Sequence, residues 1–402
     1  MQTITMSVIG KLPDGPALIV RWPGVPAPGP ADQALWMAAR AVPPGARVFV
    51  AGPGATSGAL WAARSGAETL CWTDNVAEAE SLRATLTHHH FECALPTPDA
   101  AHQNAAHQNA AHQNAAHQNA PHRIFVQADF TGITPESCET ALLYLPRGRE
   151  RQVELLRLAG AILRPGGRLI FAGARNEGIK SALKQAQELF GQAGIVAHKG
   201  GYHAGLAQRQ AGAFPIPELV CDETVVNIDE TPAHLIACTG VFAAGRLDEG
   251  AASLIAGMRI QPGERVLDLG CGVGVVGLAA LRRGAVVTCS DVSARATEST
   301  RRTLAANGYP QATVHLACGA AGLPDRGFDT VITNPPFHQG HGVDFEVAQL
   351  FVREAARVLR PGGRLFLVAN SFLPYAPWLQ KSFAKAGVAW ENRRFRVWKA
   401  EK

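Results

Sequence analysis

The chain alternates short apolar runs with longer segments in which apolar residues recur at helical spacing. In its C-terminal half the apolar runs predict strands at 265–269, 286–290, 313–317, 328–333 and 364–369. The segments between them predict helices near 274–283, 293–306 and 344–359. Because the strands are apolar along their length and alternate with helices, we expect a parallel sheet covered on both faces.

Two features mark the ends of this half. The run LRPGG at 359–363 ends a helix with proline and glycine before the next strand. The tail at 390–400, WENRRFRVWKA, alternates apolar and polar positions and predicts a final strand. Residues 205–235 show no helical pattern, so we expect a linker there, with room for a β-ribbon.

The same order of motifs occurs twice along the chain. Residues 48–67, VFVAGPGATSGALWAARSGA, align without a gap with residues 266–285, VLDLGCGVGVVGLAALRRGA. Residues 163–173, LRPGGRLIFAG, correspond in the same way to residues 359–369, LRPGGRLFLVA. Two matching blocks in the same order predict two copies of one domain.

The first copy is longer because of a repeat. Gly52 and Leu163 are 111 residues apart, whereas Gly270 and Leu359 are 89 apart. Four tandem AHQNA units at 101–120 supply 20 of the 22 extra residues. We therefore interpret the repeat as an insertion in a surface loop, without a role in the fold.

These patterns predict the fold class and the domain boundaries. We expect an α/β protein with two tandem, duplicated Rossmann-like domains. The first domain should span residues 1–204, the linker 205–235 and the second domain 236–402. A chain of 402 residues is long enough for two such domains at about 100–200 residues each.

The composition indicates a globular protein without a membrane span. Apolar residues make up 47% of the chain and charged residues 18%, which excludes a disordered chain. No apolar run reaches the roughly 18 residues of a transmembrane helix, and the N-terminal segment lacks the apolar core of a signal peptide. We therefore expect a soluble, cytoplasmic protein.

The distribution of charge and the spacing of the cysteines indicate which partners and metal sites to expect. Residues 236–402 hold 20 Lys and Arg against 13 Asp and Glu, a net charge of +7 that suits a polyanionic partner. No two of the eight cysteines are spaced as CxxC, so we expect no metal site. In a reducing compartment the thiols should be free and buried.

Three glycines follow the first strand of the second copy. Gly270, Gly272 and Gly274 lie where the strand gives way to a helix, and glycine lets a ligand approach the backbone closely. Asp268 precedes them, and Asp291 ends the next strand, where a carboxylate can accept both hydroxyls of a ribose. This combination predicts a nucleoside cofactor at the carboxyl edge of the sheet.

A turn of unusual composition, TNPPFHQGHG at 333–342, follows a later strand. Pro335 and Pro336 end that strand, and the residue before a proline is held extended, which directs Asn334 away from the sheet. A rigid turn at a strand end that carries one amide and one aromatic ring could hold a flat heterocycle. Phe337 can stack on such a ring, a contact worth about 1–3 kcal/mol.

These motifs carry a resemblance to a known family. The second copy resembles the Rossmann-like S-adenosylmethionine-dependent methyltransferases, and NPPF is typical of those that methylate amino groups. Three further stretches, TGVFAAGRLDEG, VANSFLPY and RFRVWKA, make the chain most similar to the two-domain bacterial 16S ribosomal RNA guanine-N2 methyltransferases of the RsmC type. The similarity covers both domains and is strong from about residue 239 onward.

The resemblance implies a reaction and a set of site residues. The reaction is methyl transfer from S-adenosylmethionine to N2 of a guanine in 16S ribosomal RNA, with that RNA or the small ribosomal subunit as partner of a monomeric enzyme. The implied cofactor-binding residues are Asp268, Gly270, Cys271, Gly272, Gly274, Asp291, Val292 and Asn334. The implied catalytic residues are Asn334, Pro335 and Phe337, and the implied substrate-binding residues are Pro336, Phe337 and His338. The stretch Thr239 to Phe242 and Asp248 are implied near the methionine end of the cofactor, with an amphipathic entry to the domain as the alternative.

Several alternatives remain open. The target could be a 23S guanine, adenine N6 in DNA or a glutamine amide in a protein, and the FLPY motif favours the 16S enzyme while Phe337 disfavours the glutamine enzymes. A different class is a non-catalytic RNA-binding module for ribosome assembly, which would have no reason to keep Asp268, Asp291 and Asn334. Because Cys318 and Gly319 stand where many relatives have an acid, backbone groups could hold the adenine.

The first copy lacks the residues that this chemistry needs. It has Val50 and Thr56 in place of Asp268 and Gly274, and LYLPRG at 143–148 in place of NPPF. Its strand-end acid, Asp74, is displaced by one position. We predict a degenerate domain without cofactor or catalysis, whose cluster RGRER at 147–151 is either an RNA contact or a solvated helix start.

Overall fold

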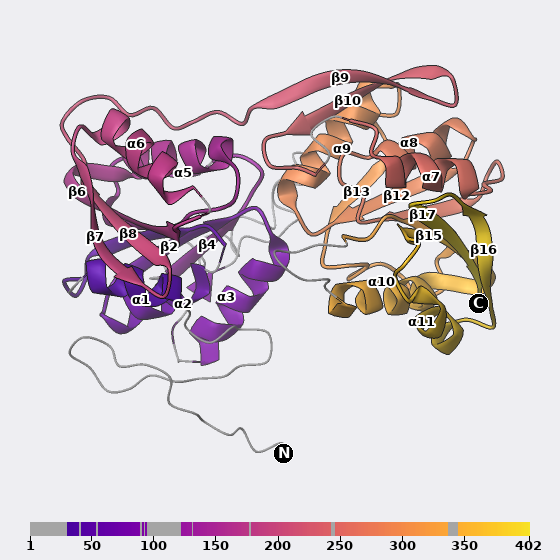
Figure 1. Ribbon diagram of the computed structural model, residues 1–402, viewed down its shortest axis with the longest axis horizontal. Coiled ribbons are helices and arrows are strands. Elements are labelled where there is room, and N and C mark those ends of the chain that lie inside the picture. Colours follow the sequence, from indigo (N-terminus) through magenta and orange to yellow (C-terminus); the bar gives the residue numbers. More distant parts are fainter. Residues whose placement is uncertain are drawn as a thin grey trace, which may run out of the picture. The chain divides into compact units, whose positions relative to one another are not determined.

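The structure is a computed structural model that describes residues 30–39, 42–53, 55–88, 91, 93–94, 122–130, 132–176, 178–242, 246–336 and 345–402. The AHQNA repeat lies outside these residues. The chain forms two compact units, a first unit Met1–Glu218 and a second unit Leu219–Lys402 (Figure 1). Within the described ranges, no helix is long and apolar enough to cross a membrane.

The second unit contains a seven-stranded sheet and a separate two-stranded ribbon. The sheet order is β13-β12-β11-β14-β15-β17-β16, in which the last two strands are antiparallel to their neighbours and the others are parallel. Its elements are β9 (Cys221–Ile228), β10 (Thr231–Cys238), α7 (Glu249–Gly257), β11 (Arg265–Leu269), α8 (Val275–Arg282), β12 (Val286–Asp291), α9 (Ala294–Ala306), β13 (Thr313–Leu316), β14 (Phe328–Thr333), α10 (Phe345–Val358), β15 (Leu359–Asn370), α11 (Tyr375–Ser382), β16 (Lys385–Glu391) and β17 (Phe395–Glu401).

The first unit repeats this topology. Its sheet order is β3-β4-β2-β1-β5-β6-β8-β7, which matches the second sheet strand for strand once the two-residue β3 is set aside. Its elements are α1 (Pro30–Ala39), β1 (Arg47–Ala51), α2 (Ala55–Arg64), β2 (Glu68–Thr73), α3 (Val76–His88), β3 (Cys93–Ala94), β4 (His122–Val126), β5 (Cys138–Tyr144), α5 (Arg149–Ile162), β6 (Leu163–Ala174), α6 (Ile179–Phe190), β7 (Ala193–Lys199) and β8 (Tyr202–Gln208).

Helices cover both faces of the second sheet, as the apolar strands predict. Val266 of β11 packs into a core with α7, α8 and α9, whereas its neighbour Leu267 packs into a second core with α10 and α11. Side chains alternate between the two faces of a strand, so one β11 supplies both cores. Figure 1 shows the same layering, with α7–α9 and α10–α11 on opposite sides of the sheet.

The sequence-based elements of the second unit agree closely with the structure. The predicted strands 265–269 and 328–333 have the observed bounds. β15 starts five residues earlier than the predicted 364, because Leu359 already pairs with Phe328 before the Pro-Gly turn shifts the register. The alternating tail is β17, which forms a hairpin with the unpredicted β16.

The segment expected as a linker is divided between the two units. Its first residues belong to β8, which pairs antiparallel with β6 and β7 in the first sheet. Its later residues form the ribbon of β9 and β10 in the second unit. A two-residue turn at Asp229 and Glu230, both with positive φ, joins these two strands as the right-handed twist of a hairpin requires.

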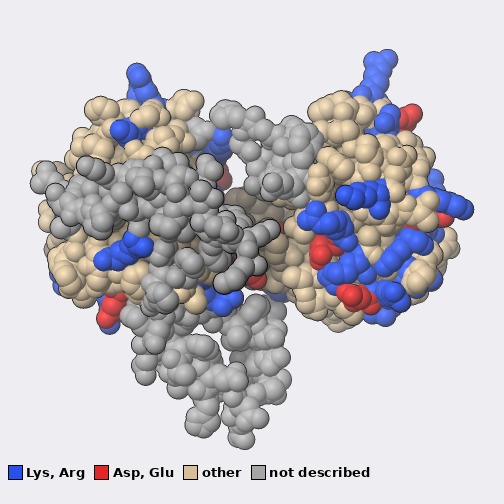
Figure 2. All heavy atoms as spheres, turned by 90° about the horizontal axis from the view of Figure 1, so that it is seen from below, with Lys and Arg blue, Asp and Glu red and all other residues tan. Residues whose placement is uncertain are grey.

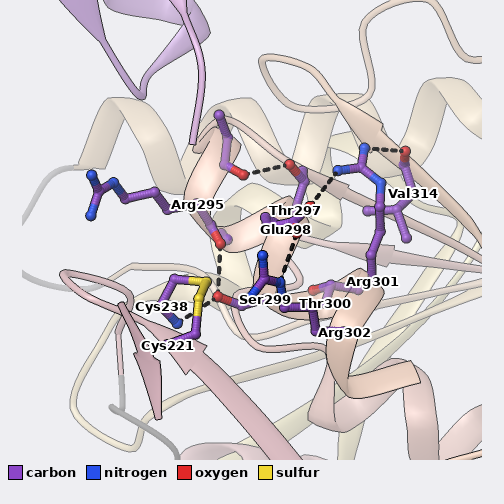
Figure 3. A network of polar contacts seen from close by, with 12 residues as sticks. Cys221, Cys238, Arg295, Thr297, Glu298, Ser299, Thr300, Arg301, Arg302 and Val314 are labelled. Atoms are coloured by element: carbon purple, nitrogen blue, oxygen red, sulfur yellow. Dashed lines mark hydrogen bonds and ion pairs between the residues drawn. A yellow bond between two sulfur atoms is a disulfide. The ribbon is translucent and has the colours of Figure 1, made fainter. Parts of the chain in front are cut away.

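The ribbon is held on α9 by polar side chains of that helix. Ser299 Oγ accepts from the Cys238 amide at 2.9 Å, and Thr303 Oγ1 accepts from the Ile236 amide at 2.9 Å. Ser299 also donates to the Arg295 carbonyl, which lies one turn earlier on the same helix. Figure 3 shows Ser299 between α9 and the end of the ribbon. These side chains serve as hydrogen-bond acceptors for backbone amides at the edge of β10, where no neighbouring strand among the described residues supplies them.

The expectation that all cysteines are free thiols is wrong for one pair. Cys221 and Cys238 form a disulfide that closes the open end of the ribbon (Figure 3). They are 17 residues apart in sequence but opposite each other in the β9–β10 register. The spacing alone did not reveal this pairing, because it depends on the position of the hairpin turn. Cys71, Cys138, Cys271 and Cys289 are free and buried, as expected.

We expect Cys221→Ser to lower the free energy of unfolding of the oxidised protein by about 3 kcal/mol, because a loop of 17 residues is no longer closed in the unfolded chain. Thermal unfolding with and without a thiol reductant measures this effect. The variant and the wild type should melt together in reductant. A variant as stable as the oxidised wild type would contradict the prediction.

Candidate functional site

Three neighbouring strands end at one edge of the second sheet. Leu269 of β11 has Ser290 of β12 and Thr333 of β14 as its register partners. Thr333 Oγ1 also donates to the Leu269 carbonyl at 2.7 Å, which fixes the end of β14 against β11. The residues that follow, Asp291 and Asn334, therefore begin at the same carboxyl edge as the glycine loop. This is the edge at which doubly wound sheets bind ligands.

The glycine loop turns directly into α8. Gly270, Gly272 and Gly274 all have positive φ, at 76°, 58° and 81°, where other residues would be strained. A Cβ atom on Gly274 would lie 3.0 Å from the Thr300 side chain, so this glycine is also needed for packing. A Cβ atom on Gly272 would meet nothing within 4 Å. The backbone at Gly272 therefore faces open space, as an approaching ligand requires.

Asp291 is fixed by backbone amides on both sides. Its Oδ2 accepts from the Gly272 amide at 2.9 Å, and its Oδ1 accepts from the Ser293 amide at 2.9 Å. These two bonds orient the carboxylate at the end of β12, and a carboxylate has about four acceptor sites in all. Val292, the next residue, is half-buried beside it. The geometry fits the predicted ribose contact.

Asp268 is a buried carboxyl group behind the glycine loop. Its Oδ2 accepts from the Gly277 amide at 2.8 Å at the start of α8. The pKa of Asp268 is raised to about 7: burial raises it most, the Gly277 hydrogen bond opposes this rise, and the nearby Asp291 charge adds to it. A cationic ligand that approaches this carboxyl group would stabilise its ionised form.

Cys271 lies within the glycine loop, and its backbone amide donates to the Ser290 carbonyl at 3.0 Å. Its thiol shares a hydrogen bond with the thiol of Cys289 and accepts from Thr300 Oγ1 at 3.3 Å. The contact with Cys289 and then burial raise the pKa of Cys271 well above its usual value. The raised pKa favours the protonated thiol over the nucleophilic thiolate.

Asn334 has a partner that the sequence did not predict. Its Nδ2 donates to Asp248 Oδ2 at 3.0 Å, and the same oxygen caps α7 by accepting from the Ala251 amide at 3.0 Å. Asn334 is half-buried, Pro335 is buried and Pro336 is exposed. An Asp directly before an apolar helical segment is a helix-start signal, and it could have located α7 and its cap.

The structure describes only some of the other predicted site positions. Phe337 and His338 lie outside the described residues. Phe242 is 73% exposed, so its side chain does not line a buried pocket. Near the expected adenine position, the Gly319 carbonyl accepts from Ser290 Oγ at 2.6 Å, which fixes the loop after β13.

The corresponding edge of the first unit is closed by a tyrosine. Val50 and Asp268 have Leu142 and Ile332 as register partners, so Tyr144 stands at the position of Asn334. The Tyr144 ring is buried, and its hydroxyl donates to Asp32 of α1 at 2.8 Å. A Cβ atom on Gly52 would come within 1.8 Å of the Tyr144 carbonyl, so this glycine loop packs on the strand end itself. Such packing supports the prediction that the first copy is degenerate.

The RGRER cluster is partly committed to contacts inside the first unit. Arg151 forms ion pairs with Asp74 at 3.2 Å and with Glu154 at 2.7 Å. Its guanidinium also lies 5.5 Å from the centre of the Trp72 ring. Arg151 and the displaced acid Asp74 therefore stabilise the end of this sheet, which favours the structural interpretation over an RNA contact for this residue.

The fold and the edge define a class of protein. A seven-stranded sheet of this order, a glycine loop, a strand-end Asp and an Asn-Pro-Pro turn together define an S-adenosylmethionine-dependent methyltransferase of amino groups. No group of three His, Cys, Asp or Glu in the part of the chain that the structure describes could hold a metal ion.

Comparisons with known proteins agree with this class. Residues 233–399 match the family model "Methyltransferase small domain", and residues 66–198 match "Methyltransferase small domain N-terminal". The ribosomal RNA small subunit methyltransferase C of Pseudomonas aeruginosa (strain LESB58) is 37% identical over 268 residues, which are 65% of this chain and 79% of that protein. The enzyme of the same name from Hahella chejuensis is 36% identical over 270 residues, 64% of this chain and 76% of that protein.

A solved structure is similar over both units. It is the Thermus thermophilus 16S rRNA N2 G1207 methyltransferase (RsmC) in complex with AdoMet and guanosine, with a TM-score of 0.77 and 26% identity over 99% of this chain and 98% of that one. The chain belongs to the ribosomal RNA small subunit methyltransferase C family. The predicted fold class of two tandem methyltransferase domains is thereby confirmed.

We expect the affinity for S-adenosylmethionine to fall below pH 7. In the predicted site the cationic cofactor would favour ionised Asp268. The pKa of about 7 in the free protein means that the carboxyl group would have to lose a proton on binding at lower pH. The dissociation constant should rise by up to about tenfold per pH unit below 7 and level off above it.

Calorimetric titrations between pH 5.5 and 8.5 test this dependence. Asp268→Asn, which cannot ionise, should bind more weakly at pH 8.5 and show a flat profile. Equal wild-type affinity at both ends of the range would refute the role given to Asp268.

Proposed function

We propose that the protein transfers a methyl group from S-adenosylmethionine to the exocyclic N2 of a guanine in 16S ribosomal RNA. The observation that carries this proposal is the meeting of Gly272, Asp291 and Asn334 at one sheet edge. The solved relative with AdoMet and guanosine supports both the cofactor and the acceptor base.

Methylation of the guanine amine depends more on its orientation than on a general base that removes its proton. Its lone pair is conjugated into the ring, so it attacks an electrophile poorly. Asn334 Oδ1 and the Pro335 carbonyl accept the two N2 hydrogens and favour a pyramidal nitrogen. They also stabilise the positive charge that would develop on N2 as its bond to the methyl carbon forms, while the bond from that carbon to the sulfonium sulfur breaks and leaves a neutral thioether. The nitrogen then loses a proton to solvent.

The residues of the first two strand ends fit the cofactor. S-adenosylmethionine supplies an electrophilic methyl group on a sulfonium centre. Asp291 would accept the ribose hydroxyls, the Gly272 backbone would pass beneath the ligand, and Asp268 would stabilise its cationic end. Phe337, in the proposed role, would stack on the guanine beside them.

The nucleotides on either side of the guanine also need a protein surface to which they can bind. Phe372 follows β15 at the carboxyl edge and is 72% exposed. The Ser371 amide donates to the Arg394 carbonyl at 2.9 Å, which keeps Phe372 near Arg393, an exposed residue with no ion pair among the described residues. Figure 2 shows that Lys and Arg side chains gather on the visible face of the second unit, where acidic side chains are fewer. An exposed aromatic ring near an arginine without an ion pair among the described residues suits single-stranded RNA.

The remaining parts of the proposal concern the first copy, the oligomeric state and the cellular compartment. The first copy would bind no cofactor and would support the fold or RNA binding, since Tyr144 replaces the acceptor amide. The enzyme would act as a monomer in the cytoplasm, where its substrate is made.

We expect Asn334→Ala to reduce kcat by about 10²–10³-fold, because one acceptor of the developing charge is lost. The dissociation constant for S-adenosylmethionine should stay within about twofold, since its proposed main contacts are Asp268, Gly272 and Asp291. Single-turnover kinetics and calorimetry measure the two quantities. Equal losses in turnover and in cofactor affinity would instead mean that Asn334 is structural.

The nature of the product tests the assignment itself. The purified protein is incubated with unmethylated 16S ribosomal RNA or small subunits and S-adenosylmethionine, and the digested nucleosides are analysed by mass spectrometry. We expect N2-methylguanosine. N6-methyladenosine, methylated 23S RNA only, or RNA binding without methylation would each select one of the alternatives.

We expect Phe372→Ala to raise KM for the RNA by about tenfold, as loss of one stacking contact worth about 1–3 kcal/mol predicts. The cofactor affinity should not change. Val225→Ala, which trims a 56% exposed residue on β9, serves as the matched control and should leave KM unchanged. An unaltered KM in the Phe372 variant would remove this residue from the RNA surface.

A further inference from the structure

The hydrogen bond between Asn334 and Asp248 links two segments that are 86 residues apart. The Asp248 carboxylate lies at the first turn of α7, and its Oδ2 accepts both from Asn334 Nδ2 and from the Ala251 amide, each at 3.0 Å. One oxygen therefore caps a helix and holds the amide proposed to bind the substrate.

A carboxylate determines which end of an amide faces it. Ionised Asp248 can only accept hydrogen bonds, so it binds the NH2 end of Asn334 and turns the oxygen end away. An amide rotated by half a turn has almost the same shape but would present hydrogens to the guanine amine, which also carries hydrogens. Among the described residues, Asn334 Oδ1 receives no hydrogen bond, so it is available as an acceptor.

The first turn of α7 also packs closely on this pair. Gly250 is buried, and a Cβ atom there would lie 2.9 Å from Asp248 Oδ2. The same atom would lie 3.2 Å from Asn334 Oδ1 and 3.3 Å from its Nδ2. The backbone of α7 therefore covers the hydrogen bond at close range, which restricts the rotamers that Asn334 can adopt.

We propose that Asp248 is a positioning residue, which fixes the amide of Asn334 so that Oδ1 and not Nδ2 meets the guanine amine. The proposal rests on the function proposed above. Asp248 itself would touch neither the base nor the methyl group. In place of the methionine-end contact that the resemblance implies, it would act through Asn334 alone.

The first unit provides a comparison for this contact. There, Asp32 of α1 accepts from the Tyr144 hydroxyl at 2.8 Å, and Tyr144 stands where Asn334 stands in the second unit. In both copies a carboxylate near the start of the first helix thus meets the residue at the same position at the end of the corresponding strand. In the first copy this contact can only join helix to sheet, because a phenol donates one hydrogen and leaves no amide oxygen to orient. An experiment must separate this structural role from positioning.

Two substitutions at Asp248 separate its structural role as a helix cap from its positioning of Asn334. Asp248→Ser keeps a good helix cap but is too short to reach Asn334. Asp248→Asn also caps, and its carbonyl oxygen can accept from both Ala251 and Asn334. We expect the Ser variant to lose about tenfold to a hundredfold in kcat with cofactor affinity within about twofold, and the Asn variant to recover most of the turnover.

Further variants make the result decisive. Tyr144→Phe deletes the matching contact of the first unit, and we expect it to lower Tm without changing kcat. Asn334→Ala combined with Asp248→Ser should be no slower than Asn334→Ala alone, because Asp248 acts only through that amide.

Two outcomes would overturn the proposal. One is wild-type kcat in Asp248→Ser while Asn334→Ala is slow. The other is an equal loss of kcat in the Ser and Asn variants together with a fall in Tm as large as that of Tyr144→Phe. If Asn334→Ala itself retained wild-type turnover, the proposed function of Asn334 would fail, which is a distinguishable result.

Discussion

The parallel pairing of β11 with β12 and β14 is the constraint on which the site depends. It places the ends of the three strands in register, so that the glycine loop, Asp291 and Asn334 start from one edge although they are up to 64 residues apart in sequence. A shift of one residue in either pairing would turn their side chains to the opposite face of the sheet. Two hydrophobic cores, one on each face of β11, fix that register.

Much of this arrangement could be predicted from the sequence. The strands 265–269 and 328–333 follow from apolar runs bounded by glycine and proline, and the Asn-Pro-Pro turn indicates an amine-binding group. The contacts of Asp248 and the disulfide of Cys221 could not be predicted in this way. Both depend on how segments distant in the chain pack together, and a local pattern does not encode the position of a helix cap relative to a strand end.

The two copies show which parts of the fold serve packing and which serve chemistry. Apart from the two-residue β3, both sheets have the same strand order, and in both an acid near the start of the first helix contacts the end of the corresponding strand. They differ in the groups that would face a ligand, since Val50 replaces Asp268 and Tyr144 replaces Asn334. The scaffold thus tolerates the loss of the polar groups, which supports the view that those groups are kept in the second unit for ligand binding.

The most direct measurement of the central claim is a crystal structure of the protein with guanosine and S-adenosylhomocysteine. The account predicts that the guanine N2 lies within about 2.7–3.2 Å of both Asn334 Oδ1 and the Pro335 carbonyl, with the cofactor sulfur on the other side of the nitrogen. A guanine whose N2 faces away from this turn, or an Asn334 that presents Nδ2 to the base, would contradict it.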